Sequence, residues 1–374
     1  MTDVSNQLST TRKLASPYHA RQYFGSLNGI RAVAILGVLW HHTAPRYDSV
    51  PITQRGYLGV DLFFVLSGFL IVTLLLREND RYNQIDLRSF YARRALRIFP
   101  LFYTVIFGVL VASVFMESDA VSSFRSEWLA HSTYTSNLVE TTSILAISWS
   151  LATEEQFYLI WPPIQRFAGV LALPFLGLVI AISQLVNFGI IFSGKWAEGW
   201  ELGDVTLTPI CLGVLAAYAL HYRFDVFGSL LSSRWVAPVL GATTIFVANL
   251  ESDVDGIVGV HRLSIHLLMM LLVASVVVRE DNGLAPILKL EPIARLGVIS
   301  YGMYLLHVIV MAVINLALPW WAEQEESLLG FAIVLITTVG AAELSFKYFE
   351  KPILSQKTRF ANESGLAAST SRQT

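Results

Sequence analysis

Two ionisable side chains, Arg31 and His42, interrupt the first long apolar segment of the chain. Their spacing returns to within about 20° of the same face of an α-helix, whereas His41 points about 80° away from it. The helical rise between them is about 16 Å, so they lie near opposite ends of that face. His42 could act there as a general base and Arg31 could bind an anion, because ionisable groups inside a membrane usually have a function. Two simpler interpretations stay open: Arg31 could extend to the interface, and His42 could be an interfacial histidine with satisfied hydrogen bonds.

Three further ionisable side chains lie in later apolar segments, and two of them could assist that histidine. Asp61 begins the second apolar segment, and Glu154 lies near the start of the fourth. Both segments start on the side where the first one ends, so we expect both carboxylates at about the depth of His42. A carboxylate beside an imidazole fixes its tautomer and stabilises its charged form, although capping a helix is the more frequent role at the position of Asp61. His307 falls near the middle of the ninth segment, where a hydrogen bond between helices is an alternative role.

A group of arginines precedes the third apolar segment. Arg93 and Arg97 are four residues apart on one helix face, with Arg94 three residues before Arg97. Guanidinium groups at this spacing suit phosphate oxygens, although the same residues could simply anchor the helix at anionic lipid headgroups. The sequence contains no Walker loop, no GxGxxG after a strand, no zinc-type Cys/His spacing and no GxSxG elbow. Composition alone favours the anchor, and we expect no metal.

The remainder of the chain has the composition of a membrane protein. Apolar residues make up 54% of it and charged residues 14%, against about 25% charged in globular domains. Because apolar stretches of spanning length recur throughout, we predict an all-α polytopic membrane protein, a bundle of about ten transmembrane helices. The single cysteine, Cys211, excludes an intrachain disulfide. The predicted spans are 28–44, 57–76, 98–116, 149–166, 170–192, 205–222, 236–250 (the shortest), 263–279, 296–317 and 328–349.

Basic residues predict the orientation of this bundle. Six arginines occupy the connection from Arg77 to Arg97, which is therefore cytosolic under the positive-inside rule. Loops predicted on the other side are acidic, and an even number of spans leaves both termini in the cytosol. We expect a polar cytosolic leader over residues 1–26 without a cleavable signal peptide, a transmembrane domain over 27–354 and a flexible cytosolic tail over 355–374.

Six short motifs, in this order, resemble the acyltransferase-3 family of integral-membrane O-acyltransferases, which act on bacterial surface polysaccharides and some macrolides. The motifs extend over nearly the whole chain. They are Leu27–Arg31 with His42; Gly59–Phe64 with Ser67–Phe69; Arg93 and Arg94 with Arg97, Ile98, Pro100 and Tyr103; Trp149–Leu151 with Glu154, Phe157 and Tyr158; Ser300 and Tyr301 with Tyr304, Leu305 and His307; and Phe349–Pro352.

The resemblance implies a multi-pass protein of the bacterial inner membrane that transfers an acyl group, most commonly acetyl, from acyl-coenzyme A to a hydroxyl. Arg31 and His42 match the arginine-to-histidine motif of the family. Family members commonly carry aspartate where this chain has Asn28, so the chain lacks a negative charge beside Arg31. Some members have an additional extracytoplasmic esterase-like domain, which we do not expect here. The matching motifs also imply substrate contacts from Ser67, Trp149, Tyr158, Tyr301 and His307.

These observations favour an acyl-coenzyme A-dependent enzyme. We expect Arg31 and the three arginines of the third span to hold the donor's phosphates at the cytosolic mouth. His42, oriented by Asp61 or Glu154, would accept the proton of a hydroxyl on a glycan, a lipid-linked sugar or a small secreted molecule. A transient acyl-histidine stays open. The alternative function is a transporter or flippase for a lipid-linked sugar or amphiphile, against which the lack of a visible inverted repeat counts. A third alternative, a structural or sensor membrane protein, explains least, because it gives the buried ionisable residues no function.

Overall fold

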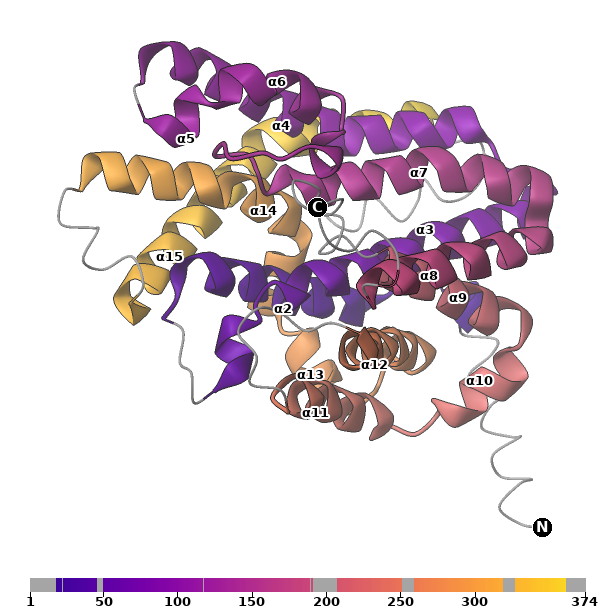
Figure 1. The fold of residues 1–374 in the computed structure, drawn as a ribbon. Coiled ribbons are helices and arrows are strands. Elements are labelled where there is room, and N and C mark those ends of the chain that lie inside the picture. The colour runs from indigo at the N-terminus through magenta and orange to yellow at the C-terminus, as the bar shows by residue number, and fades with distance from the viewer. Residues whose placement is uncertain are drawn as a thin grey trace. The chain divides into compact units, whose positions relative to one another are not determined.

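The computed structural model describes residues 18–21, 23–45, 50–116, 118–188, 190, 207–250, 259–318 and 327–360. These residues form helices and turns, and none of them lies in a β-strand. Each of the ten predicted spans coincides with a helix (Figure 1). These helices are α2 Gly25–Thr43, α3 Leu58–Tyr82, α4 Leu87–Phe115, α7 Ser148–Ala168, α8 Ala172–Asn187, α9 Thr208–Tyr222, α11 Val236–Ala248, α12 Gly259–Val278, α14 Glu291–Ala317 and α15 Leu328–Ser345.

Length and apolarity qualify six helical runs among the described residues as membrane spans. One of them joins α7 and α8 through the short 3₁₀ turn η3, Gly169–Leu171. A seventh candidate pairs α9 with α10, Phe224–Leu230, which is bent by 111°. The count of ten crossings and the cytosolic termini stay predictions.

Large apolar side chains cover the outside of these helices. Phe115 is 80% exposed and Phe167 is 79% exposed, and many leucines and isoleucines are more than half exposed. Soluble monomers rarely show apolar surface on this scale. The exposed side chains therefore face lipid, and the chain is a membrane protein.

Contacts between residues divide the chain into two compact units, described separately here. Unit 1 comprises Met1–Gln84, Leu171–Gln184 and Leu207–Ser300, and unit 2 comprises Ile85–Val170, Leu185–Thr206 and Tyr301–Thr374.

Unit 1 is built around α3, which packs most extensively against α9 and also contacts α2 and α12. Two glycines permit the close approach of α3 and α9. A Cβ atom added at Gly68 would collide with the carbonyl oxygen of Ile210, and one added at Gly213 would collide with that of Val65. Small residues at such a contact let two helix backbones pack closely, which is how helices associate in lipid. The other elements of unit 1 are η1 Pro51–Gln54, most of α8, α10, α11, α13 Ala285–Leu288 and the start of α14.

Unit 2 is built around α4. The side chain of Asp86 caps this helix by accepting a hydrogen bond from the Ser89 backbone N–H at 3.1 Å. Residues 118–148 form two short helices that pack on α4, and the ring of Tyr134 stacks on Phe102 at 4.6 Å between centroids. These elements are α5 Asp119–Ser122, α6 Phe124–Ser132 and the 3₁₀ turn η2 Ser136–Leu138.

After α15 the chain continues without leaving the helical conformation. A π-helical turn η7, Phe346–Glu350, leads into α16, Lys351–Leu354, and then into the 3₁₀ helix η8, Ser355–Phe360. All three contact α4. The first six residues of the predicted tail are therefore helical and packed, and the remainder lies outside the described residues.

Candidate active site

His42 occupies the last turn of α2, and its tautomer follows from one hydrogen bond. Its Nδ1 lies 2.9 Å from the carbonyl oxygen of Val38. Because a carbonyl oxygen only accepts, Nδ1 carries the hydrogen and the lone pair lies on Nε2. His41 lies on another face, since a Cβ atom added at Gly56 would collide with its backbone and Cβ, and its ring meets Tyr57 edge-on. In its neutral form the His42 imidazole thus carries its lone pair on Nε2, as general-base catalysis requires.

The packing of α2 against α3 determines the depth of Asp61. A Cβ atom added at Gly59 would collide with the carbonyl oxygen of Ala34, and one added at Gly56 with that of Gly37. The two helices are antiparallel at this contact, so Asp61 lies at about the level of Ala32, roughly 15 Å from His42 along α2 and close to the depth of Arg31. Asp61 and His42 therefore differ in depth, contrary to the expectation from the sequence. The physical reason is that residues 50–57, including η1, turn back along α2 before α3 begins.

The carboxylate of Asp61 is bound by α12. Its Oδ2 accepts hydrogen bonds from His266 Nε2 at 3.0 Å and from Arg262 Nη2 at 3.5 Å. All three side chains are buried, His266 completely. A buried carboxylate and a buried guanidinium partly offset each other's desolvation, so removing either one would leave the other charge buried without that partner. The contacts described for Asp61 are to these two residues.

Arg31 lies one helical turn after Asn28, the position at which the family commonly has aspartate. The Asn28 side chain donates a hydrogen bond to the hydroxyl of Tyr23 at 2.7 Å. Arg31 is half-buried and exerts an electrostatic effect on the same hydroxyl. The asparagine thus has a neutral hydrogen-bond partner in place of an ion pair with Arg31.

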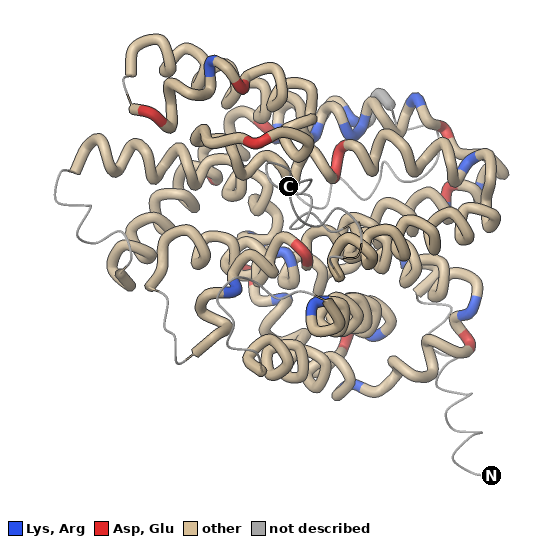
Figure 2. The backbone as a smooth tube through the Cα atoms, viewed as in Figure 1, with Lys and Arg blue, Asp and Glu red and all other residues tan. Residues whose placement is uncertain are grey.

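In unit 2, the predicted arginine group lies in the first turns of α4, and its Arg94 faces α7. Arg94 Nη2 lies 3.7 Å from Glu155 Oε1, and its guanidinium carbon lies 3.7 Å from the centre of the Tyr158 ring. Figure 2 shows basic residues gathered along α4 and acidic residues on the adjacent α7. The described ion pair is made by Glu155, whereas the sequence singled out Glu154, which is half-buried one position earlier. We call Arg93, Arg94 and Arg97 the basic cluster.

A second polar region of unit 2 follows one face of α14. The Tyr301 hydroxyl donates to the carbonyl oxygen of Ile98 on α4 at 2.8 Å. The Tyr304 hydroxyl lies 2.6 Å from both the carbonyl oxygen of Ile147 and the Ser150 hydroxyl, at the start of α7. His307 is fully buried, and its Nδ1 donates to the Tyr304 carbonyl oxygen at 2.6 Å. Tyr301 and Tyr304 thus join three helices of unit 2.

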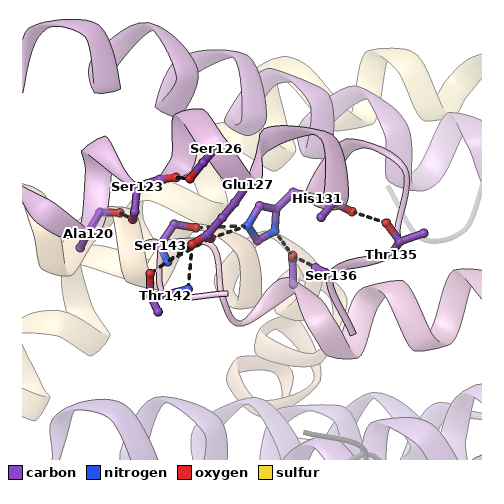
Figure 3. Close-up of polar contacts among 11 residues, drawn as sticks. Ala120, Ser123, Ser126, Glu127, His131, Thr135, Ser136, Thr142 and Ser143 are labelled. Carbon is purple, nitrogen blue, oxygen red and sulfur yellow. Dashed lines mark hydrogen bonds and ion pairs between the residues drawn. The ribbon is translucent and has the colours of Figure 1, made fainter. Parts of the chain in front are cut away.

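A buried histidine outside the predicted spans forms a Ser–His–Glu arrangement (Figure 3). His131 Nδ1 accepts from the Ser148 hydroxyl at 2.7 Å, and its Nε2 lies 3.3 Å from Glu127 Oε2 and 3.1 Å from the Ser143 hydroxyl. His131 is 0% and Ser148 2% exposed, and Glu127 also accepts backbone N–H bonds from Thr142 and Ser143. A substrate cannot reach this serine, so the network serves to fasten residues 136–148 to α6.

This network should make the segment sensitive to acid. Burial lowers the pKa of His131, against an opposing effect of Glu127. Burial alone would raise the pKa of Glu127, but hydrogen bonds from Thr142, Ser143 and His131 outweigh it and lower that pKa. In the opened segment both side chains have their ordinary pKa values, about 6.5 for the histidine and about 4.3 for the carboxylate, and these are higher than in the closed segment. The closed segment therefore loses stability relative to the opened one as the pH falls below each of these values.

Hydrogen exchange measures this effect. Amide protection of residues 124–143, corrected for intrinsic rates, should decrease between pH 7 and pH 5, and His131→Gln should remove that dependence. Equal protection at both pH values in the wild type would contradict the assignment.

The structure brings together some predicted residues and not others. Within unit 2, Arg94 of the basic cluster meets Tyr158 beside Glu155. Arg31, His42, Asp61 and Ser67 belong to unit 1, and Trp149, Glu154, Tyr158, Tyr301 and His307 belong to unit 2. A site that combines residues of both units stays a prediction. Ser67 and Trp149 are half-buried on α3 and α7.

Several charged residues of these clusters were not singled out as site residues from the sequence. Arg262 and His266 are four residues apart at the start of an apolar span, and that spacing was the available signal. Glu155 is adjacent to the predicted Glu154. Among the described residues, no group of three His, Cys, Asp or Glu side chains could hold a metal ion.

Comparison with known proteins identifies the family. A model of the Acyltransferase domain matches residues 24–344. The protein named "Putative O-acetyltransferase SACOL0978" from Staphylococcus aureus strain COL is 28% identical over 380 residues, which cover 92% of this chain and 59% of the relative. "O-acetyltransferase OatA" from strain NCTC 8325 is 26% identical over 364 residues, which cover 91% of this chain and 59% of the relative.

This chain thus spans less than two thirds of the length of these relatives. No solved structure matches it. Because the family model covers most of the residues, including every predicted site residue, the chain belongs to the acyltransferase-3 family.

Proposed function

We propose that this protein is an O-acyltransferase of the bacterial inner membrane that moves an acyl group, acetyl in the simplest case, from acyl-coenzyme A to a hydroxyl. The acceptor is a cell-surface glycan, a lipid-linked sugar or a small secreted molecule. The family and the O-acetyltransferase relatives support the reaction class. The observation that carries the mechanism is the His42 imidazole, held by the Val38 carbonyl in the tautomer that presents Nε2 as a base.

In the proposed reaction, Nε2 of His42 takes the hydroxyl proton as the acceptor oxygen attacks the thioester carbonyl carbon. The carbon–sulfur bond then breaks, and the departing thiolate takes that proton from the imidazolium, so coenzyme A leaves as a thiol. Arg31 and the basic cluster bind the donor's phosphates, because guanidinium groups form paired hydrogen bonds with phosphate oxygens. Asp61 acts by holding α12 through Arg262 and His266, and the role of Glu154 in orienting His42 stays a prediction.

The proposal keeps, as predictions, the substrate contacts that the family resemblance implies for Trp149, Tyr158, Tyr301 and His307 in unit 2 and for Ser67 in unit 1. The contacts of Tyr304 with Ser150 and with the carbonyl oxygen of Ile147 support it, because they fix the helices on which these side chains stand.

The test is release of coenzyme A by membranes that contain the protein. Acetyl-coenzyme A is supplied alone or with glycan, lipid-linked sugar and macrolide acceptors, and membranes without the protein serve as the control. We expect release that depends on one class of acceptor. Movement of a lipid-linked sugar across the membrane without any release would overturn the proposal and favour a transporter.

A further inference from the structure

Tyr134, which follows α6 in unit 2, has a backbone conformation that is unusual for a tyrosine. Its φ of 54° lies in the left-handed region. Two hydrogen bonds impose this conformation: the Tyr134 N–H donates to the His131 carbonyl oxygen at 3.1 Å, and the Thr135 N–H donates to that of Ala130 at 2.8 Å. This pair is the Schellman arrangement of a helix end, where glycine is the usual residue because it has no Cβ atom. Strain of this kind is found mostly at functional sites.

The side chain and the carbonyl group of Tyr134 connect α4 with α7. The ring centroid lies 4.6 Å from that of Phe102 in a stacked geometry and 6.0 Å from that of Phe99, both on α4. The carbonyl oxygen accepts a hydrogen bond from Gln156 Nε2 on α7 at 2.8 Å. Tyr134 is therefore fixed in position from both helices.

The hydroxyl group of Tyr134 contributes nothing to this packing. Its oxygen is buried, and none of the described residues forms a hydrogen bond with it. Phenylalanine would make the same ring contacts without burying an unsatisfied polar group, which is unfavourable. Two other tyrosine hydroxyls at α4 differ, because that of Tyr301 donates to the Ile98 carbonyl oxygen and that of Tyr91 to the Leu159 carbonyl oxygen. The Tyr134 hydroxyl thus has the geometry of a group that binds a ligand.

The place of this hydroxyl along α4 indicates the kind of ligand. Phe102, on which the ring stacks, lies eight residues after Arg94, about 12 Å along the helix. Arg94 belongs to the residues proposed to hold the donor's phosphates, and an extended pantetheine arm is longer than this distance. The arm is an apolar chain with amide groups at intervals. Aromatic rings with one hydroxyl suit it, because the rings contact its methylene groups and the hydroxyl binds a carbonyl oxygen.

We propose that the Tyr134 hydroxyl donates a hydrogen bond to a carbonyl oxygen of the acyl donor's pantetheine arm. The inference rests on the proposed function for the identity of the donor. The hydroxyl binds the donor and takes no part in proton transfer. The arm has amide carbonyls and, in the acylated donor, a thioester carbonyl. These groups accept a hydrogen bond in the same way, and the experiment distinguishes them.

The experiment measures equilibrium binding of coenzyme A and of acetyl-coenzyme A to the intact chain in phosphatidylcholine nanodiscs, so it does not depend on turnover. Tyr134→Phe keeps the ring and removes only the hydroxyl. It should weaken binding about fivefold, the effect of one neutral hydrogen bond. A loss for both ligands assigns an amide carbonyl, and a loss for acetyl-coenzyme A alone assigns the thioester carbonyl. Adenosine diphosphate, which lacks the arm, should bind the wild type and Tyr134→Phe equally.

A matched variant and the melting temperature separate binding from structure. Tyr91→Phe also removes one hydroxyl that lies between α4 and α7, but its partner is the Leu159 carbonyl oxygen, so donor binding should stay unchanged. Tyr134→Phe should melt at the same temperature as the wild type or higher, because no hydrogen bond within the protein is lost.

Four results would overturn the inference. They are unchanged binding of both donors by Tyr134→Phe, an equal loss in Tyr91→Phe, an equal loss of adenosine diphosphate binding, and a lower melting temperature of Tyr134→Phe, which would show that the hydroxyl stabilises the fold. Donor binding that depends on the Tyr134 hydroxyl in a protein that never transfers an acyl group would support the site and overturn the proposed function instead.

Discussion

Asp61→Asn should destabilise the protein by about 3–5 kcal/mol, because it removes the carboxylate that offsets the buried charge of Arg262. Arg262 and His266 both donate to the same carboxylate oxygen, and all three side chains are buried. In the wild type this cluster joins α3 to α12 inside unit 1. The readout is unfolding of purified protein in detergent, followed by denaturant titration or by the melting temperature.

A matched variant separates charge from packing. Asp61→Asn combined with Arg262→Met removes both charges, and it should recover a large part of the lost stability, as expected for a coupled pair. Ser67→Ala, on the same helix at a half-buried position, should change stability by less than about 0.5 kcal/mol. If Asp61→Asn unfolds like the wild type, the cluster does not stabilise the contact between α3 and α12.

His42→Ala should reduce acceptor-dependent turnover by about 10²–10⁴-fold, the usual contribution of a general base. Binding of coenzyme A should persist, because the imidazole is proposed to act on the hydroxyl and not on the phosphates. His41→Ala provides the control at the adjacent position. Its ring packs at Tyr57, so this variant should retain most of the wild-type rate.

The comparison is decisive because the two histidines share one turn of one helix. Equal losses in His41→Ala and His42→Ala would point to damage of the helix end and would contradict a specific role for His42. The kcat and KM of both variants should be measured. Removing a base that acts only in the transition state lowers kcat without raising the KM for the donor.

The helices of this protein could be predicted because a lipid bilayer permits few other structures. Backbone groups in hydrocarbon must be paired within the segment, so apolar stretches of sufficient length become helices. Each of the ten predicted segments accordingly contains one. Even the short segment 236–250 does so, as α11. Hydropathy does not give the number of crossings, because it does not show where a helical run bends. The 111° bend between α9 and α10 is one such break.

The partners of the charged residues were harder to predict. Asp61 was paired with His42 on the assumption that both lie at the same membrane boundary. Close packing at Gly56 and Gly59 instead sets the depth of α3, and α12 supplies the partners. Such pairings depend on the tertiary contacts of segments far apart in the chain, which a single sequence does not record. The arginines of α4 could be predicted because their helical spacing is local, whereas the contact of Tyr134 with α4 depends on how residues 118–148 fold.

The most direct test of the proposed O-acyltransferase supplies acetyl-coenzyme A with a labelled acetyl group to the protein in nanodiscs, together with the acceptor identified in the release assay. Mass spectrometry of the acceptor and quantification of free coenzyme A then follow both halves of the reaction. The proposal predicts one labelled, alkali-labile ester on the acceptor for each coenzyme A released, and neither product with His42→Ala. Release of coenzyme A without an ester on the acceptor, or full ester formation by His42→Ala, would contradict it.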